Sequence, residues 1–139
     1  MPEKTLCMIK PDGLARGLER EIIARIERTG LIVETSRTIT MTPAEAADLY
    51  QPHVGKKFYP GLVKFITSGP VTVCRVSGDG AVAKLRRLMG DTDPLAAERG
   101  TIRGDLREKA VINENGIIKN LVHGSDSPDS ARRELAIFF

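Results

Sequence analysis

Short apolar runs alternate with longer amphipathic segments along the chain, and this pattern predicts the secondary structure. Residues 5–9 are apolar enough for a central strand, and turn residues follow them. Between Leu18 and Ile26, isoleucines recur at helical spacing, which predicts a helix with one apolar face. Gly30 is the expected end of that helix.

The pattern continues in the same way through the middle of the chain. Residues 31–41 are rich in β-branched side chains and predict a long strand. Thr42 is the expected N-cap of a helix whose first residue is Pro43. A second helix is expected at residues 59–67, and another strand at residues 69–78. Two helices therefore separate these two strands.

The last third of the chain contains the longest segment without a clear period. Asp79 is the expected N-cap of a helix that reaches Met89. Residues 90–119 are expected to be mostly irregular, and residues 120–123 to form a short strand. Ser127 with the following proline starts the last helix.

This order of elements predicts an α+β fold. Apart from the inserted helix pair and the final helix, it is the split β-α-β arrangement of the ferredoxin-like sandwich. We expect a mostly antiparallel four-stranded sheet with helices on one face, and a long loop before the last strand. The length of 139 residues suits a single domain covering residues 1–139. The fold class alone does not indicate a function.

Composition and charge narrow the function. The chain is 41% hydrophobic and 28% charged, as in ordinary globular proteins. We find neither a membrane-length apolar run nor a signal-peptide pattern, and expect a cytoplasmic protein with no membrane partner. The formal charge of +3 favours anionic ligands, while aromatic residues are too few for a nucleic-acid stacking surface. Cys7 and Cys74 lie in apolar strands and are expected to be buried free thiols.

One of the two histidines lies in a sequence that favours a reactive role. His123 ends the last strand and is followed by small residues, which leave an imidazole accessible. Glu134 lies within the apolar stripe of the last helix and needs a polar partner when buried. We expect it to bond the His123 ring, with Ser125 nearby, and so to fix the tautomer of a neutral nucleophile. A His–Glu pair that only closes a strand–helix corner explains the same residues equally well. His53 has no comparable carboxylate and is expected in a surface loop.

Basic residues and a threonine cluster around the long loop. Arg86 or Arg87 lies near the end of a helix, Thr92 in the following turn, and Arg103 beside a glycine. Lys10 ends the first strand. Each is by itself more often a solvated residue, but together with a reactive histidine they indicate phosphate chemistry.

The sequence blocks TLCMIKPDGLARGL, LVKFITSGPV, TDPLAAERGTIRGD, NLVHGSDS and SARRELAIFF resemble, in order, those of the nucleoside diphosphate kinase family. The resemblance covers nearly the whole chain. It implies a ping-pong kinase, in which the γ-phosphate of a nucleoside triphosphate passes to a histidine and then to a nucleoside diphosphate. A nucleotide- or RNA-binding module without catalysis is the competing interpretation of this fold class.

The resemblance also implies roles for individual residues. His123 matches the phosphorylated histidine, and Glu134 the carboxylate that orients it. The remaining matches are Ser125 in the hydrogen-bond set of the histidine, Lys10 and Asn120 at the ribose hydroxyls and nearby phosphate, Arg86, Thr92 and Arg103 at the phosphates, Tyr50 beside the histidine, and Phe58 stacked on the base.

The resemblance further implies Mg²⁺ held mainly by the nucleotide phosphates, with no protein metal cage. Nucleoside di- and triphosphates are the expected ligands, without specific nucleic acid. A homo-oligomer, either a tetramer or a hexamer built from dimers, is also expected. Three departures from the family pattern stand out: Asp93 where asparagine is common, a longer segment over residues 106–119, and the absence of a C-terminal extension after Phe139.

The longer segment carries a hairpin signal. Asn115 and Gly116 form a turn pair flanked by valine and isoleucine residues, which predicts a short β-hairpin within residues 110–119. Such a hairpin needs a surface to cover. That surface is either a neighbouring subunit or the hairpin's own subunit, and the sequence favours neither.

Overall fold

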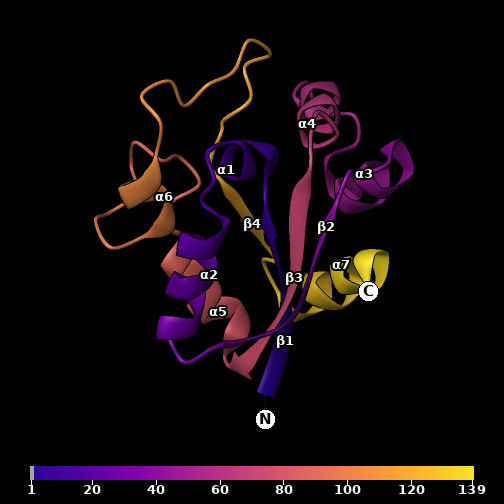
Figure 1. The fold of residues 1–139 in the computed structure, drawn as a ribbon. Helices are drawn as coiled ribbons and strands as arrows, with labels where there is room; N and C mark the ends of the chain where they lie inside the picture. Colours follow the sequence, from indigo (N-terminus) through magenta and orange to yellow (C-terminus); the bar gives the residue numbers. More distant parts are fainter. Residues whose placement is uncertain (1) are drawn as a thin grey trace.

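The computed structural model describes residues 2–139, and a four-stranded antiparallel sheet lies at its centre (Figure 1). The strands are β1 (Pro2–Ile9), β2 (Ile32–Ile39), β3 (Val71–Asp79) and β4 (Val122–Gly124). Their order across the sheet is β2-β3-β1-β4, and every neighbouring pair is antiparallel. The first strand is thus an interior strand. The predicted split β-α-β topology is confirmed.

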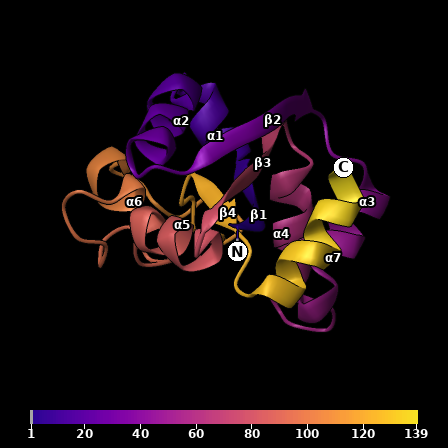
Figure 2. The ribbon, with the colours of Figure 1, turned by 90° about the horizontal axis from the view of Figure 1, so that it is seen from below.

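Helices cover both faces of the sheet (Figure 2). On one face lie α2 (Glu19–Arg28) and α5 (Ala81–Met89), the helices of the ferredoxin-like part. On the other lie α3 (Pro43–Leu49), α4 (Tyr59–Ile66) and α7 (Pro128–Phe138). The expectation of helices on one face therefore holds only for the ferredoxin-like part, since the inserted pair and the last helix bury the second face.

Strand β1 joins the two cores because its side chains alternate between the faces of the sheet. Cys7 and Ile9 belong to the core under α2 and α5, while Leu6 and Met8 belong to the core under α3, α4 and α7. All four side chains are fully buried. A strand buried on both faces reads as a continuous apolar run, which is why residues 5–9 were recognisable in the sequence.

Several element ends follow the sequence signals. Thr42 and Glu45 form a capping box at the start of α3, with Thr42 Oγ1 accepting from the Glu45 amide at 3.1 Å. Ser127 caps α7 by accepting from the amide of Ser130 at 3.1 Å. Helix α2 ends just before Gly30, whose φ of 89° is left-handed.

Asp79 does not cap α5, contrary to our expectation. It is the last residue of β3, and Gly80, in the left-handed region with φ 61°, is the N-cap. The amide of Val82 instead donates to the carboxylate of Glu3 at 2.8 Å. A carboxylate brought by the neighbouring strand thus supplies the cap, and a local sequence window cannot show this.

The structure also contains three short helices that the sequence did not predict. The turn expected after the first strand is a short helix, α1 (Pro11–Ala15). A 3-10 turn, η1 (Gln51–His53), follows α3. The segment expected to be irregular contains α6 (Ile102–Leu106), which begins where Thr101 Oγ1 accepts from the Gly104 amide at 3.0 Å. Each of these helices is too short for the hydrophobic period to reveal it.

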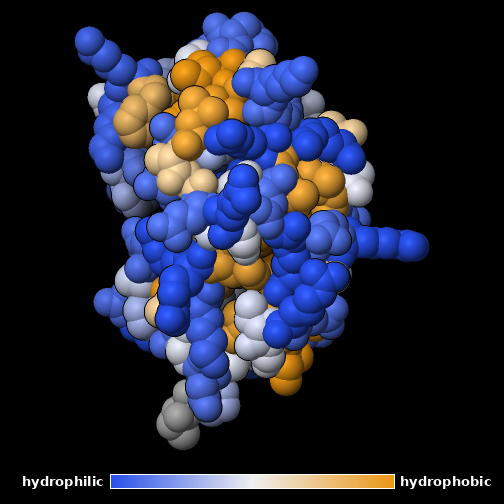
Figure 3. All heavy atoms as spheres, turned by 90° about the vertical axis from the view of Figure 1, so that its left-hand side faces the viewer, coloured by the Kyte–Doolittle hydropathy of each residue, from blue (hydrophilic) through white to orange (hydrophobic). Residues whose placement is uncertain are grey.

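The predicted hairpin is present in a minimal form. Ile112 and Ile118 make one antiparallel bridge, and the Asn113 amide donates to the Ile117 carbonyl at 2.9 Å. Ile117 is buried, and its Cδ1 lies 2.9 Å from where a Cβ on Gly61 of α4 would stand. The hairpin therefore packs partly on its own subunit. Ile112, by contrast, is 58% exposed. Apolar side chains gather near the top of Figure 3, the end at which Figure 1 shows the loop that carries this hairpin.

Cys7 and Cys74 are buried free thiols, as predicted, and they face each other as register partners on β1 and β3. Burial raises the pKa of both thiols, that of Cys74 to about 12. Because the thiolate is the reactive form, both side chains are inert core residues. Over residues 2–139, the helices are all too short or too polar to cross a membrane.

Candidate active site

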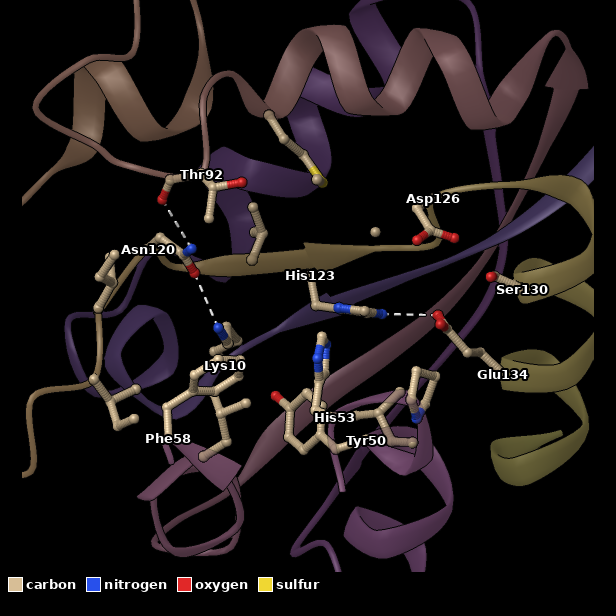
Figure 4. Close-up of a pocket in the computed structure, with 18 of the residues that line it drawn as sticks. Lys10, Tyr50, His53, Phe58, Thr92, Asn120, His123, Asp126, Ser130 and Glu134 are labelled. Carbon is tan, nitrogen blue, oxygen red and sulfur yellow. Dashed lines mark hydrogen bonds and ion pairs between the residues drawn. The ribbon is translucent and has the colours of Figure 1, made fainter. Parts of the chain in front are cut away.

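A cavity of about 550 Å³ opens at the end of β1, between the α3–α4 connection, α5, the hairpin and α7 (Figure 4). The fold brings nine of the residues predicted for the site to the wall of this cavity. They are Lys10, Tyr50, Phe58, Arg86, Thr92, Arg103, Asn120, His123 and Glu134. Ser125 is fully buried directly behind the wall.

The imidazole of His123 and the carboxylate of Glu134 form a hydrogen bond across the β4–α7 corner. His123 Nε2 lies 2.7 Å from Glu134 Oε1, and Ser125 Oγ donates to the same oxygen at 2.8 Å. Glu134 is 4% exposed, whereas the side chain of His123 keeps 23% of its surface accessible. The ring is thus held from behind and open to the cavity in front.

The charge of Glu134 decides which nitrogen of His123 is available. Burial alone raises the pKa of this carboxyl, but the bonds from His123 and Ser125 and the nearby Arg133 outweigh it, so its pKa is lowered. An ionised carboxylate only accepts hydrogen bonds. In a neutral ring Nε2 must therefore carry the proton, and Nδ1 keeps a free lone pair. This is the state that a histidine nucleophile requires.

Since the resemblance implies that His123 is phosphorylated, we expect Glu134→Gln to slow this step about tenfold to a hundredfold. A neutral amide can still accept from Nε2, but it stabilises the positive charge that develops on the ring less well. Losing the charge from such a bond costs roughly 1.5–3 kcal/mol, or one to two powers of ten in rate. Single-turnover phosphorylation by ATP checks this. An unchanged rate would mean that the pair is only a structural corner.

Lys10, Asn120 and Thr92 form a polar chain along a second wall of the cavity (Figure 4). Lys10 Nζ donates to Asn120 Oδ1 at 2.9 Å, and Asn120 Nδ2 donates to the Thr92 carbonyl at 3.0 Å. Burial lowers the pKa of Lys10 to about 8, against the opposing charge of Asp12. The ammonium is thus partly desolvated, which strengthens its attraction for an anion.

Leu121, just before the histidine strand, adopts a conformation that the sequence does not reveal. Its φ of 73° is the single left-handed value outside glycine in residues 2–139. The Leu121 amide donates to Asp12 Oδ2 at 3.0 Å, and its carbonyl accepts from the Lys10 amide at 2.8 Å. Such a conformation costs about 1–3 kcal/mol and persists only where the surroundings impose it. It also explains why β4 begins at Val122 and not at residue 120.

Arg103 and Arg86 both line the cavity, but they differ in their surroundings. Arg103 is 6% exposed and donates to three carbonyls, those of Asn120 at 3.1 Å, Gly90 at 3.1 Å and Val122 at 2.7 Å. Burial, and then the charge of Arg86, lower its pKa to about 10. Besides the place at the phosphates that the resemblance implies, the guanidinium of Arg103 therefore ties the long loop to β4. Arg86 is exposed.

Aromatic rings form the third wall. Phe58 is 44% exposed at the start of α4, and Tyr50, at the end of α3, is 6% exposed. His53 lies 5.5 Å from the Phe58 ring and 6.1 Å from the Tyr50 ring, centroid to centroid, and lines the cavity below His123 (Figure 4). His53 lies half-exposed in the connection between α3 and α4, as expected, but η1 also turns it into the cavity, which the sequence did not predict.

The remaining acidic residues near the site have local roles or lie at its edge. Asp93 Oδ1 accepts from the Leu95 amide at 2.9 Å, so its carboxylate stabilises the turn after α5. Asp126 lines the cavity, and a hydrogen bond from Ser130 lowers its pKa. Within residues 2–139, His, Cys, Asp and Glu form no group of three that could hold a metal ion.

Taken with the split β-α-β sheet, a histidine held by a buried carboxylate in a basic cavity is typical of phosphotransferases that carry the transferred group on the ring. The comparisons with known proteins then give the family. A family model described as nucleoside diphosphate kinase matches residues 3–139. The chain belongs to the nucleoside diphosphate kinase family, and it is a phosphotransferase rather than a binding module without catalysis.

Curated relatives agree over almost the whole chain. A nucleoside diphosphate kinase from Listeria monocytogenes is 46% identical over 137 residues, covering 99% of this chain and 88% of that protein. One from Mycobacterium tuberculosis is 48% identical over 140 residues, covering 100% and 98%.

Solved structures support the same fold. A nucleoside diphosphate kinase from Borrelia burgdorferi, a transition state mimic with bound vanadate and ADP, has a TM-score of 0.92 at 35% identity and covers 99% of this chain and 87% of its own. A halophilic enzyme from Halobacterium salinarum in complex with CDP has a TM-score of 0.89 at 42% identity, with coverage of 100% and 88%.

Proposed function

We propose that this protein transfers the γ-phosphate of a nucleoside triphosphate to a nucleoside diphosphate through phosphohistidine on His123. The single observation that carries the proposal is the hydrogen bond from Nε2 to the buried Glu134, which leaves Nδ1 free in the cavity. The Nδ1 lone pair attacks the γ-phosphorus, and the bond to the β-phosphate oxygen breaks as the diphosphate leaves. A terminal oxygen of a second diphosphate then attacks the same phosphorus, and the bond to Nδ1 breaks.

The cavity walls supply the positive charge that this transfer needs. Little covalent chemistry falls to the protein in phosphoryl transfer, so positioning and charge neutralisation dominate. We assign Arg86, Arg103 and Thr92 to the phosphates, and Lys10 with Asn120 to the ribose hydroxyls and the adjoining phosphate. The mutual bond between Lys10 and Asn120 supports this pairing, because it fixes both groups before a nucleotide arrives. Tyr50 and Ser125 complete the support of the histidine.

Mg²⁺ enters this proposal as part of the substrate. Within the described residues the cavity offers two carboxylates, and the one on Glu134 is already bonded by His123 and Ser125. The ion requires oxygen ligands in octahedral geometry, which nucleotide phosphates and water can supply. The proposed substrate is therefore the magnesium complex of the nucleotide.

The direct test is to look for the intermediate. The protein is incubated with ATP labelled on the γ-phosphate in the presence of Mg²⁺, and the protein-bound label is then treated with acid and with alkali. We expect a label that is acid-labile and alkali-stable, and that leaves on addition of any nucleoside diphosphate as the corresponding triphosphate. A protein that binds ATP but carries no label would overturn the proposal.

Arg86→Ala should lower kcat/KM about tenfold to a hundredfold with little effect on stability. Arg86 is exposed at the cavity, so removing it takes away a charge-assisted phosphate contact worth roughly 1.5–3 kcal/mol. Arg87→Ala is the matched control, because Arg87 is also exposed on the same helix and does not line the cavity. Steady-state kinetics of both variants check this, and equal values would place the phosphates elsewhere.

The mouth of the cavity suits a base without selecting one. Phe58 presents an exposed ring on one side, and Ile117 and Ile118 of the hairpin line the cavity too. A stacking face accepts every base, while discrimination requires hydrogen bonds to base edges. We therefore propose that Phe58 stacks on the base, and that the enzyme accepts several nucleotides.

A homo-oligomer built from dimers, a tetramer or a hexamer, completes the proposal. Its support is two exposed isoleucines: Ile32 at 61%, on the edge strand β2, and Ile112 at 58%, on the hairpin. We expect Ile112→Ser to weaken assembly without unfolding the subunit, since that side chain is exposed in the isolated chain. Light scattering across a dilution series measures the molar mass. A molar mass equal to that of the unmodified protein at every concentration would exclude an assembly role for the hairpin.

A further inference from the structure

Arg133, next to the carboxylate that holds the histidine, links two helices of the site. Its Nη1 donates to the carbonyl of Asp48 at 2.6 Å, and its Nη2 lies 3.4 Å from both the Leu49 carbonyl and Glu134 Oε2. The two carboxylate oxygens of Glu134 are thus divided, since Oε1 accepts from His123 and Ser125. One planar guanidinium therefore touches both the end of α3 and the free side of the carboxylate.

The charges around Arg133 explain why an arginine lies there. The carbonyls of Asp48 and Leu49 belong to the last turn of α3, the negative end of the helix dipole, where a cation is stabilising. On the other side lies the negative carboxylate of Glu134. Tyr50, which lines the cavity, is the residue directly after Leu49. Arg133 therefore joins the segment that carries Tyr50 to the helix that carries Glu134.

We propose that Arg133 is a positioning residue for the phosphorylation of His123, acting through Glu134. It holds the carboxylate so that Oε1 faces Nε2, and it keeps the α3 end with Tyr50 against α7. This inference rests on the proposed function. No contact between Arg133 and the nucleotide is needed for it.

The same contact also lowers the pKa of Glu134, together with the bonds from His123 and Ser125. Glu134 faces His123 and Ser125 from the β4 end, the Tyr50 phenol from the α3 end, and Arg133 from its own helix. Of these, the positive charge of Arg133 helps to lower the pKa of the carboxyl, while the uncharged phenol does not. Removing Arg133 raises that pKa. Because a protonated Glu134 no longer holds Nε2–H in the same way, activity is then lost at a higher pH on the acid side.

The experiment compares Arg133→Ala with Arg132→Ala and Arg133→Lys. Arg132 is the adjacent residue on α7, and its side chain is 72% exposed and forms an ion pair with Asp129. Single-turnover phosphorylation by ATP is measured across pH, together with the ATP dependence of the rate and the Tm of each variant. For Arg133→Ala we expect a maximal rate about tenfold lower, an unchanged half-saturating ATP concentration and an acid limb moved to higher pH.

The other two variants separate charge from geometry. Arg132→Ala should match the unmodified protein in every measurement. Arg133→Lys keeps the charge but not the planar fork, so it should restore the acid limb and only part of the rate. The inference is overturned if the pH profile and maximal rate of Arg133→Ala equal those of the unmodified protein. It is also overturned if the half-saturating ATP concentration rises while the maximal rate is unchanged, because that result would assign Arg133 to nucleotide binding. Absence of phosphoenzyme in the unmodified protein would instead overturn the proposed function itself.

Discussion

Replacing His123 with alanine is expected to abolish phosphoenzyme formation and phosphotransfer together. The side chain supplies the nucleophile, and alanine offers no atom that can take its place. The fold should survive, because the histidine is partly exposed at the cavity and Ser125 Oγ continues to donate to Glu134 after the ring is removed. Labelling with γ-labelled ATP measures the first effect, and the thermal unfolding midpoint measures the second.

His53→Ala is the matched control for this experiment. His53 is the other histidine of the chain and lines the same cavity, but its Nδ1 lies 3.1 Å from Lys56 Nζ and not beside a carboxylate. Burial, and then the charges of Lys56 and His123, lower its pKa. This variant should keep the acid-labile label. Label retained in His123→Ala and lost in His53→Ala would transfer the nucleophile's role to the second ring.

Replacing Arg103 with methionine is expected to lower the free energy of unfolding by about 3–5 kcal/mol, the range of the most damaging single substitutions. Methionine is of similar length but cannot donate hydrogen bonds, so the buried carbonyls of Asn120 and Val122 and the partly buried carbonyl of Gly90 each lose a partner. Urea denaturation measures the loss. Activity should fall as well, because the loop that carries Thr92 is no longer fixed to β4.

Arg86→Met provides the comparison, because it removes an exposed guanidinium from the same cavity. Its unfolding free energy should change by less than about 0.5 kcal/mol, as surface substitutions usually do. Equal and small losses for both variants would show that the three bonds of Arg103 contribute little to the fold. A loss of stability in the Arg103 variant alone would show that Arg103 stabilises the fold around the site, whereas Arg86 does not.

The sequence predicted those parts of the fold that depend on nearby residues. The start of α3 at Thr42 and the end of α2 before Gly30 follow from capping groups within a few positions. The bond between His123 and Glu134 was also predictable, since both residues flank one strand–helix corner. A carboxylate within an apolar helical stripe must find a polar partner close at hand.

Other features depend on residues far apart in the chain, and no local pattern shows them. The cap of α5 is a carboxylate from β1, at Glu3. The carbonyls around Arg103 belong to the turn after α5 and to the strand segment, so only the folded chain shows that this arginine is structural. The left-handed conformation of Leu121 is imposed by Asp12 and Lys10. The residues that flank each of them in the sequence give no local signal for these roles.

The interior position of β1 has a consequence for how the chain is made. Ribosomes release the N-terminus first, and β1 then exposes two apolar faces and two unpaired edges. One edge of β1 pairs with β3, whose residues lie about seventy positions later in the chain. The other edge pairs with β4, which is the last of the four strands to be synthesised. The bond between Lys10 and Asn120 likewise spans 110 positions. Long-range pairings of this kind form slowly, and strands that are still unpaired are prone to aggregation. In a growing chain, one edge of β1 therefore stays unpaired until β4 has been made, and the contacts of His123 with Glu134 can form only after that point.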